Sequence, residues 1–173
     1  MLEIYETLLC AASWNLLHFD LSWQERTDTP PAKSVNWLDF THAITFSHAV
    51  KSECTKAPEL WTAGLLQIAC FIGRGNAFSL ERQETERWEV GDEDKFMAQC
   101  MEKLLDHGIN EPIVVAHLVK NYCAMKCELN ECRSPETRKL LTQSYHRFML
   151  SPFKRKHLKR NVKQAIDLVA KDF

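Results

Sequence analysis

The chain has 173 residues, of which 45% are hydrophobic and 26% are charged, and its formal net charge is -1. This length fits one domain with a substantial core, and the near-neutral balance gives no indication of a nucleic-acid or membrane partner. No apolar run reaches the roughly 20 residues that span a bilayer, and Glu3 and Glu6 stand where a signal peptide would carry Lys or Arg. We therefore expect one helical domain over residues 1–173, cytoplasmic and either complete in itself or part of a larger redox protein or complex.

The composition predicts an all-α fold. Only five glycines are present, and β-branched residues do not alternate with polar ones over any convincing length. Apolar residues recur instead at steps of three and four, which predicts a single-domain bundle of about six to seven helices with two or three central buried helices. Seven cysteines, an odd number, lie mostly within these patterns, which indicates free thiols in a reducing compartment.

The first predicted helix covers residues 2–19 and is followed by a polar connection with two consecutive prolines, residues 24–31. The second begins near Asn36, whose side chain can cap it, with Asp39 three residues later in a capping-box arrangement. We expect this helix to end between residues 51 and 55.

The third predicted helix starts at Pro58 and extends to residue 72, where the run Gly73-Arg74-Gly75-Asn76 is expected to stop it. Gly64 should let a neighbouring helix approach closely. Beyond a weakly patterned stretch, the remaining helices are expected after Asp92, after Pro112, after Ser134-Pro135 and after Ser151-Pro152.

Three of these helices, over residues 36–50, 60–72 and 113–125, are apolar on nearly every side and are predicted to form the inner layer. A buried imidazole needs a hydrogen-bond partner, a metal or a substrate. The candidate pocket residues therefore lie on these helices or at nearby helix ends: His18, Asp39, His42, His48, His107, Glu111 and His117.

A metal site is one interpretation of the inner histidines, with His42, His48 and His117 as ligands and iron or another transition metal as the cofactor. Asp39 and His42 are three residues apart, as in the Glu-x-x-His arrangement of di-iron bundles, but a second such pair is missing from the inner helices. His42 and His48 also point about 120° apart on a regular helix. The alternative is that each imidazole is a neutral core group bonded to a backbone carbonyl or to a hydroxyl such as that of Thr41 or Thr45.

Two other features have simpler explanations. The C-x-x-C spacing of zinc sites is absent from Cys123, Cys127 and Cys132. This absence favours buried or idle thiols over a metal site. The basic run over residues 154–160 could attract phosphate or an acidic partner, but it lacks interleaved aromatic residues, so nucleic-acid binding is not expected.

Three segments, Trp14–Asp20, Trp37–Phe46 and His107–Val114, are together similar to the helical domain that accompanies Rieske-type ferredoxin domains in bacterial proteins. More remotely, the chain resembles questin-oxidase-like proteins. The resemblance implies a redox setting in which His18, His42, His48, His107 and His117 line a pocket. No Cys is followed by His at the spacing of a Rieske centre. The resemblance therefore implies that the cluster would lie on another chain, such as a Rieske-type ferredoxin partner, or on a further part of the same protein.

Two functional hypotheses follow. In the first, the chain is the helical domain of an oxidoreductase-type system, with a histidine-lined internal pocket for a metal or a small organic ligand. In the second, it is a non-catalytic scaffold that docks a redox partner, through the last basic helix and exposed Trp23 or Trp88, or pairs with a second copy as a homodimer.

Overall fold

The computed structural model describes residues 1–26, 30, 33–109, 112–151, 162 and 165–170. Its long helices are α1 (Leu2–His18), α3 (Trp37–Lys56), α4 (Trp61–Asn76), α5 (Glu93–Leu105), α6 (Pro112–Glu131) and α7 (Pro135–Leu150). A short helix α2 (Ser22–Glu25) and two 3-10 turns, η2 (Pro58–Leu60) and η3 (Glu86–Trp88), lie between them. Within the described residues the only strand-like pairing is one isolated bridge between Phe19 and Ser79, so the predicted all-α bundle is confirmed.

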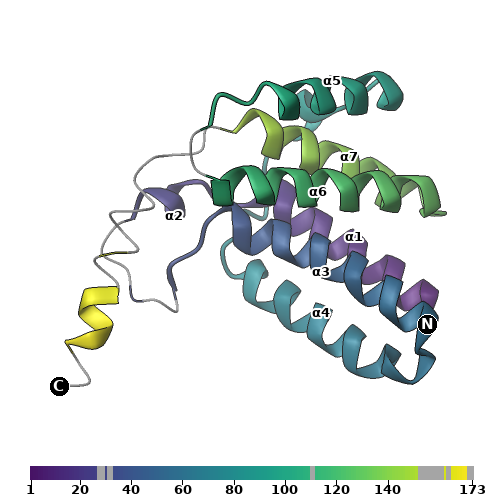
Figure 1. Cartoon of the computed structure of the whole chain (residues 1–173), viewed down its shortest axis with the longest axis horizontal. Helices are drawn as coiled ribbons and strands as arrows, with labels where there is room; N and C mark the ends of the chain where they lie inside the picture. The colour runs from purple at the N-terminus through teal and green to yellow at the C-terminus, as the bar shows by residue number, and fades with distance from the viewer. Residues whose placement is uncertain (27–29, 31–32, 110–111, 152–161, 163–164, 171–173) are drawn as a thin grey trace.

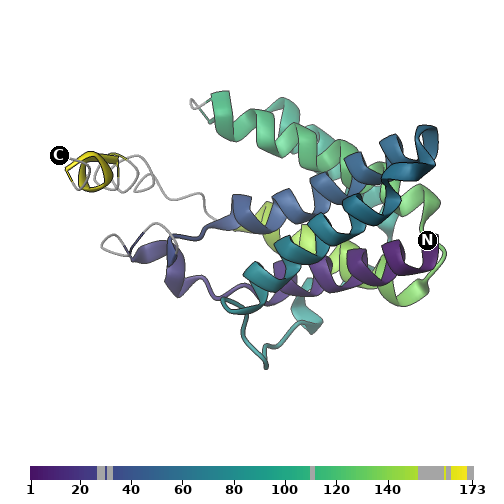
Figure 2. The same cartoon turned by 90° about the horizontal axis from the view of Figure 1, so that it is seen from below.

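Helices α1 and α3 lie at the centre of the bundle, α1 against α7, α3 and α4, and α3 also against α4 and α6 (Figure 1). His42 of α3 contacts His117 of α6, and Lys51, further along α3, contacts Glu128, further along α6. The two helices therefore run side by side in the same direction, as the views in Figures 1 and 2 show.

Several predicted helix starts are confirmed by their caps. The Asn36 side chain accepts a hydrogen bond from Leu38 N, while Asp39 accepts one from Asn36 N, which completes the capping box of α3. Asp92 caps α5 and Ser134 caps α7. These side chains satisfy backbone donors that have no partner inside the helix, and so fix where each helix begins.

Two glycines of α4 serve packing, one as predicted and one not. A Cβ on Gly64 would lie 2.5 Å from Val50 Cγ1, which confirms the predicted close approach of a neighbouring helix. The predicted helix end at residue 72 is wrong by four residues, because α4 continues through the predicted stop signal and ends at its last residue, Asn76. Gly75 instead gives room to α1 and α3, since a Cβ there would lie 3.2 Å from Asn15 Nδ2 and 3.3 Å from Phe40 Cε1.

The predicted inner layer is correct for α3 but wrong for α4 and α6, which each expose one face. On α4 the Leu66 side chain is 63% exposed, and on α6 Ile113 is 65% exposed. Small and apolar residues are tolerated at protein surfaces, so an unbroken apolar pattern did not require burial here. None of the described helices combines the length and the apolar character that crossing a membrane would require.

A buried arginine ties α7 to the end of α1. Arg147, 4% exposed, donates hydrogen bonds to the carbonyls of Leu17 at 2.6 Å and Phe19 at 2.8 Å. Its guanidinium also lies over the Trp37 ring, 5.2 Å from the centroid. The last carbonyls of a helix lack partners within it, so this side chain completes the C-terminus of α1 from a distant part of the chain.

Other predictions concern the outside of the bundle. Trp23 and Trp88, predicted as exposed docking residues, are half-buried, because Trp23 packs edge-on against Phe78 and Trp88 against His146. The basic run at residues 154–160 lies outside the described residues.

Candidate functional site between α3 and α6

Two of the predicted site histidines meet between α3 and α6. His42 Nε2 and His117 Nδ1 are 3.3 Å apart, and the two ring centroids are 4.8 Å apart with an angle of 57° between the ring planes. Both side chains are half-buried. We call these two residues the imidazole pair.

The surroundings of the imidazole pair favour its neutral form. Burial lowers the pKa of both histidines, and the positive charge of Lys120 lowers both further, although Asp39 acts in the opposite direction on His42. A neutral imidazole carries one N–H and one lone pair. In the pair, one ring nitrogen donates to the other, and the neutral state is the one that can bind a metal ion.

His48 belongs to a second cluster, further along the same two helices. Its Nδ1 is 2.7 Å from Oε1 of Glu128, a carboxylate that is 1% exposed. Lys51 Nζ donates to Glu128 Oε2 at 2.7 Å and forms an ion pair with Glu131 at 2.9 Å. We call His48, Lys51, Glu128 and Glu131 the Glu128 cluster.

The Glu128 cluster is electrostatically satisfied. Burial alone would lower the pKa of Lys51, but the hydrogen bonds and charges of Glu128 and Glu131 outweigh it and raise that pKa. Lys51 therefore remains an ammonium and compensates the buried carboxylate, which would be costly to bury alone. The buried hydroxyl of Tyr5 lies nearby, and burial together with the charge of Glu128 raises its pKa.

The three predicted metal ligands are thus divided between the two clusters: His42 and His117 come together, whereas His48 binds Glu128. Within the described residues, no group of three or more His, Cys, Asp or Glu side chains is arranged to hold one metal ion. Asp39 is engaged by Asn36 N and, at 3.5 Å, by Arg74. Glu111 lies outside the described residues.

The other two predicted pocket histidines lie elsewhere. His18 is stacked on Trp14, with a centroid distance of 4.0 Å, and its Nδ1 is 2.8 Å from the Trp14 carbonyl oxygen. His18 thus matches the alternative to a metal ligand, a core histidine bonded to a backbone carbonyl. His107 Nδ1 accepts a hydrogen bond from Ile109 N and lines a separate cavity of about 110 Å³.

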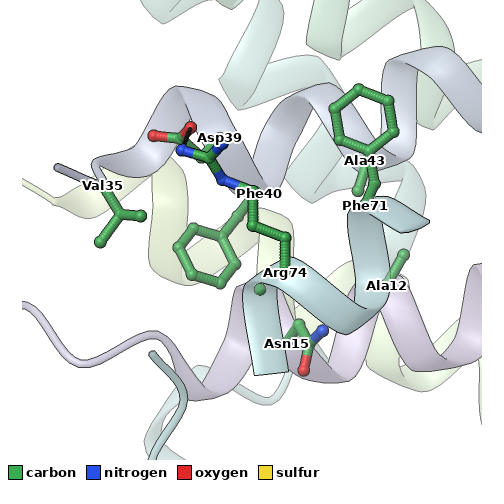
Figure 3. Close-up of a pocket in the computed structure, with 9 residues that line it drawn as sticks. Ala12, Asn15, Val35, Asp39, Phe40, Ala43, Phe71 and Arg74 are labelled. Atoms are coloured by element: carbon green, nitrogen blue, oxygen red, sulfur yellow. Dashed lines mark hydrogen bonds and ion pairs between the residues drawn. The ribbon is translucent and has the colours of Figure 1, made fainter. Parts of the chain in front are cut away.

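Asp39 lines a small cavity on another side of α3, between α1, α3 and α4 (Figure 3). The cavity has a volume of about 70 Å³, and its lining is mainly apolar, with Ala12, Phe40 and Phe71 among its residues. Figure 3 shows the Asp39 and Arg74 side chains meeting beside it. It offers space for a small apolar molecule, but none of the predicted histidines lines it.

Sequence reasoning missed Lys51 and Glu128, although one signal was available. Glu128 lies three residues after Met125 and next to Leu129, both of them buried. A carboxylate on the buried face of a helix is rarely left unpaired, so its position alone indicated a cationic partner. The partner could not be named, because Lys51 is 77 residues away in the chain.

Comparisons of the chain with protein-family models, with curated proteins and with solved structures each found no match. The resemblance to Rieske-associated helical domains therefore stays a prediction.

Proposed function

We propose that the protein is the helical component of an oxidoreductase-type system, and that the imidazole pair is its binding site for a transition-metal ion. The observation that carries the site is the 3.3 Å separation of His42 Nε2 and His117 Nδ1. The oxidoreductase setting comes from the sequence resemblance alone, which also implies a Rieske-type ferredoxin partner.

The separation of the two nitrogens fits a shared ion as well as a hydrogen bond. Two ring nitrogens that each bind one tetrahedral zinc ion at about 2.0–2.1 Å lie roughly 3.3–3.4 Å from each other. Imidazole nitrogen suits iron, copper, nickel and zinc alike. The ion would replace the proton between the rings. Because both rings are neutral, this requires a change of tautomer in the donor ring and a rotation that turns both nitrogen lone pairs toward the ion.

Two protein ligands leave several coordination positions for water or substrate. Open positions are typical of catalytic rather than structural metal sites. Lys120, whose charge is felt by both histidines, would favour an anionic ligand at these positions, such as hydroxide or a carboxylate. The same groups could bind a small organic acid without a metal, and this is the other form of the proposal.

Calorimetric titration with zinc, together with elemental analysis of the freshly purified protein, tests the site. We expect one site in the wild-type protein and a loss of affinity of about tenfold or more in His42→Ala and in His117→Ala, since each removes one of two ligands. His146→Gln is the matched control, because His146 lies on α7 with its Nδ1 against the Trp88 carbonyl. Equal zinc binding by all four proteins would reject the site.

A non-catalytic scaffold is the second candidate, and the exposed face of α4 favours it. Leu66 of α4 is 63% exposed, and Leu60 at the end of the preceding η2 is 48% exposed. Such apolar surface can be buried against a second copy or a partner. A dimer in sedimentation velocity that dissociates in Leu66→Glu, in a protein that binds no metal, would support this candidate over the first.

A further inference from the structure

Asn121, one helical turn after His117 on α6, is a buried polar side chain without a partner. It is 0% exposed, and within the part of the chain that the structure describes neither its amide oxygen nor its amide nitrogen has a hydrogen-bond partner. Burying an unpaired amide is costly, and such groups are rare in folded proteins. A bound ion or ligand is one of the few things that can satisfy it.

The register of α6 turns Asn121 toward α3. His117 contacts His42 and, further along α6, Glu128 contacts His48, so the line through His117 and Glu128 is the side of α6 that faces α3. At 3.6 residues per turn, Asn121 lies about 40° from His117 and about 20° from Glu128 around the helix axis. Asn121 therefore lies on this facing side, between the imidazole pair and the Glu128 cluster.

The Asn121 amide is within reach of an ion held by the imidazole pair. Side chains one turn apart on a helix have Cβ atoms about 5–6 Å apart, and each Cα–Cβ bond tilts toward the N-terminus of the helix, here toward His117. His42 and His117 are half-buried, whereas Asn121 is fully buried. The amide therefore lies deeper than the two imidazoles, which leaves the outer side of a shared ion open to water or substrate.

The nearest hydroxyl on the opposite helix does not use the Asn121 oxygen. Thr45 is the buried threonine of α3 that lies between His42 and His48 in the chain. Its hydroxyl donates to the backbone carbonyl of His42, at 3.4 Å. The amide oxygen of Asn121 thus remains available as a ligand.

We propose that the amide oxygen of Asn121 is the third protein ligand of a divalent transition-metal ion bound by His42 and His117. The inference rests on the proposed function of the imidazole pair. Two imidazoles and one oxygen resemble the two histidines and one carboxylate that hold iron(II) with open coordination positions in non-haem oxygenases. Because an amide is neutral, this set would leave the full charge of the ion to attract an anionic ligand.

Calorimetric titration of the full chain with zinc, repeated with cobalt(II) to follow its visible absorption, tests the third ligand. We expect Asn121→Leu to bind zinc about tenfold or more weakly than the wild type and to change the cobalt(II) spectrum, because an apolar side chain of similar size replaces one ligand. Asn121→Asp keeps an oxygen and adds a charge, so it should bind zinc at least as tightly as the wild type.

Asn15→Leu is the matched control. Asn15 is also a buried asparagine, but it lies on α1 and its amide nitrogen donates to the Ile72 carbonyl at 2.9 Å. This variant should bind zinc as the wild type does.

The outcomes separate this inference from the proposed function. Zinc affinity in Asn121→Leu equal to that of the wild type, with binding weakened in His42→Ala, would overturn the third ligand and leave the imidazole pair as the site. Weaker binding by folded Asn121→Asp would also overturn it, which keeps the test decisive if Asn121→Leu does not fold. A wild-type protein that binds no zinc would reject the proposed function and this inference together.

Discussion

At the residue scale, Glu128 shows what a buried charge requires. It is 1% exposed and is compensated by His48 and Lys51 from α3. Each carboxylate oxygen has one of these partners, so the group resembles a small buried salt-bridge network rather than an isolated pair. Removing one member of such a network leaves the others buried without compensation.

We predict that Glu128→Gln lowers the free energy of unfolding by about 2 kcal/mol, because Lys51 and His48 lose a buried carboxylate. Glu131→Gln removes the other carboxylate that binds Lys51, but its side chain is 63% exposed, so the loss should stay below about 1 kcal/mol. Urea denaturation of both variants measures the difference. Equal losses of unfolding free energy in the two variants would show that burial does not determine how much the Glu128 carboxylate contributes to stability.

At the element scale, the helix starts could be predicted and the helix faces could not. Asn36, Asp92 and Ser134 are local signals, since a cap acts on backbone groups two or three residues away. The role of Gly75 depends instead on the packing of α4, because a Cβ there would crowd Asn15 of α1 and Phe40 of α3. A glycine that ends a helix and one that admits a neighbour look alike in sequence.

We predict that Arg147→Met destabilises the fold by about 2–4 kcal/mol, because the buried carbonyls of Leu17 and Phe19 would lose their donors. Arg74→Met is the comparison, since the Arg74 side chain is 51% exposed and its contact with Asp39 is 3.5 Å long, and we expect it to change stability by less than about 1 kcal/mol. Urea denaturation followed by tryptophan fluorescence reports both. A small effect of Arg147→Met would mean that water can replace its hydrogen bonds.

At the scale of the whole molecule, three histidines make stability depend on pH. The pKa values of His18, His42 and His117 are lowered, in each case chiefly by burial. Above about pH 6.5 these imidazoles are neutral in both the folded and the unfolded chain. Below it the unfolded chain takes up protons first, so protonation favours unfolding.

We therefore predict that the free energy of unfolding falls as the pH decreases from about 6.5 towards 5, before most carboxylates titrate. The decline should level off once the pH is below the lowered pKa values of the folded state. Denaturation series on the wild type and on His42→Gln test this, and the variant should show the shallower dependence. A stability that rises over this range would contradict the assignment of neutral, buried imidazoles.

The sequence placed His42, His48 and His117 in one candidate site but did not predict how the structure groups them. His42 and His117 were both candidates because they lie on apolar helices, and the structure brings them together. That His48 faces Glu128 follows from α3 and α6 running in parallel, which no local pattern encodes. The arrangement of helices in space therefore decides which candidates share a site.

The most direct test of the imidazole pair is a zinc titration of the protein labelled with nitrogen-15 at histidine, followed through the ring-nitrogen resonances. We predict that Nε2 of His42 and Nδ1 of His117 change together, with one stoichiometry, while the resonances of His18 and His146 stay unchanged. Resonances of His42 and His117 that do not respond, or that respond independently of each other, would contradict a shared site.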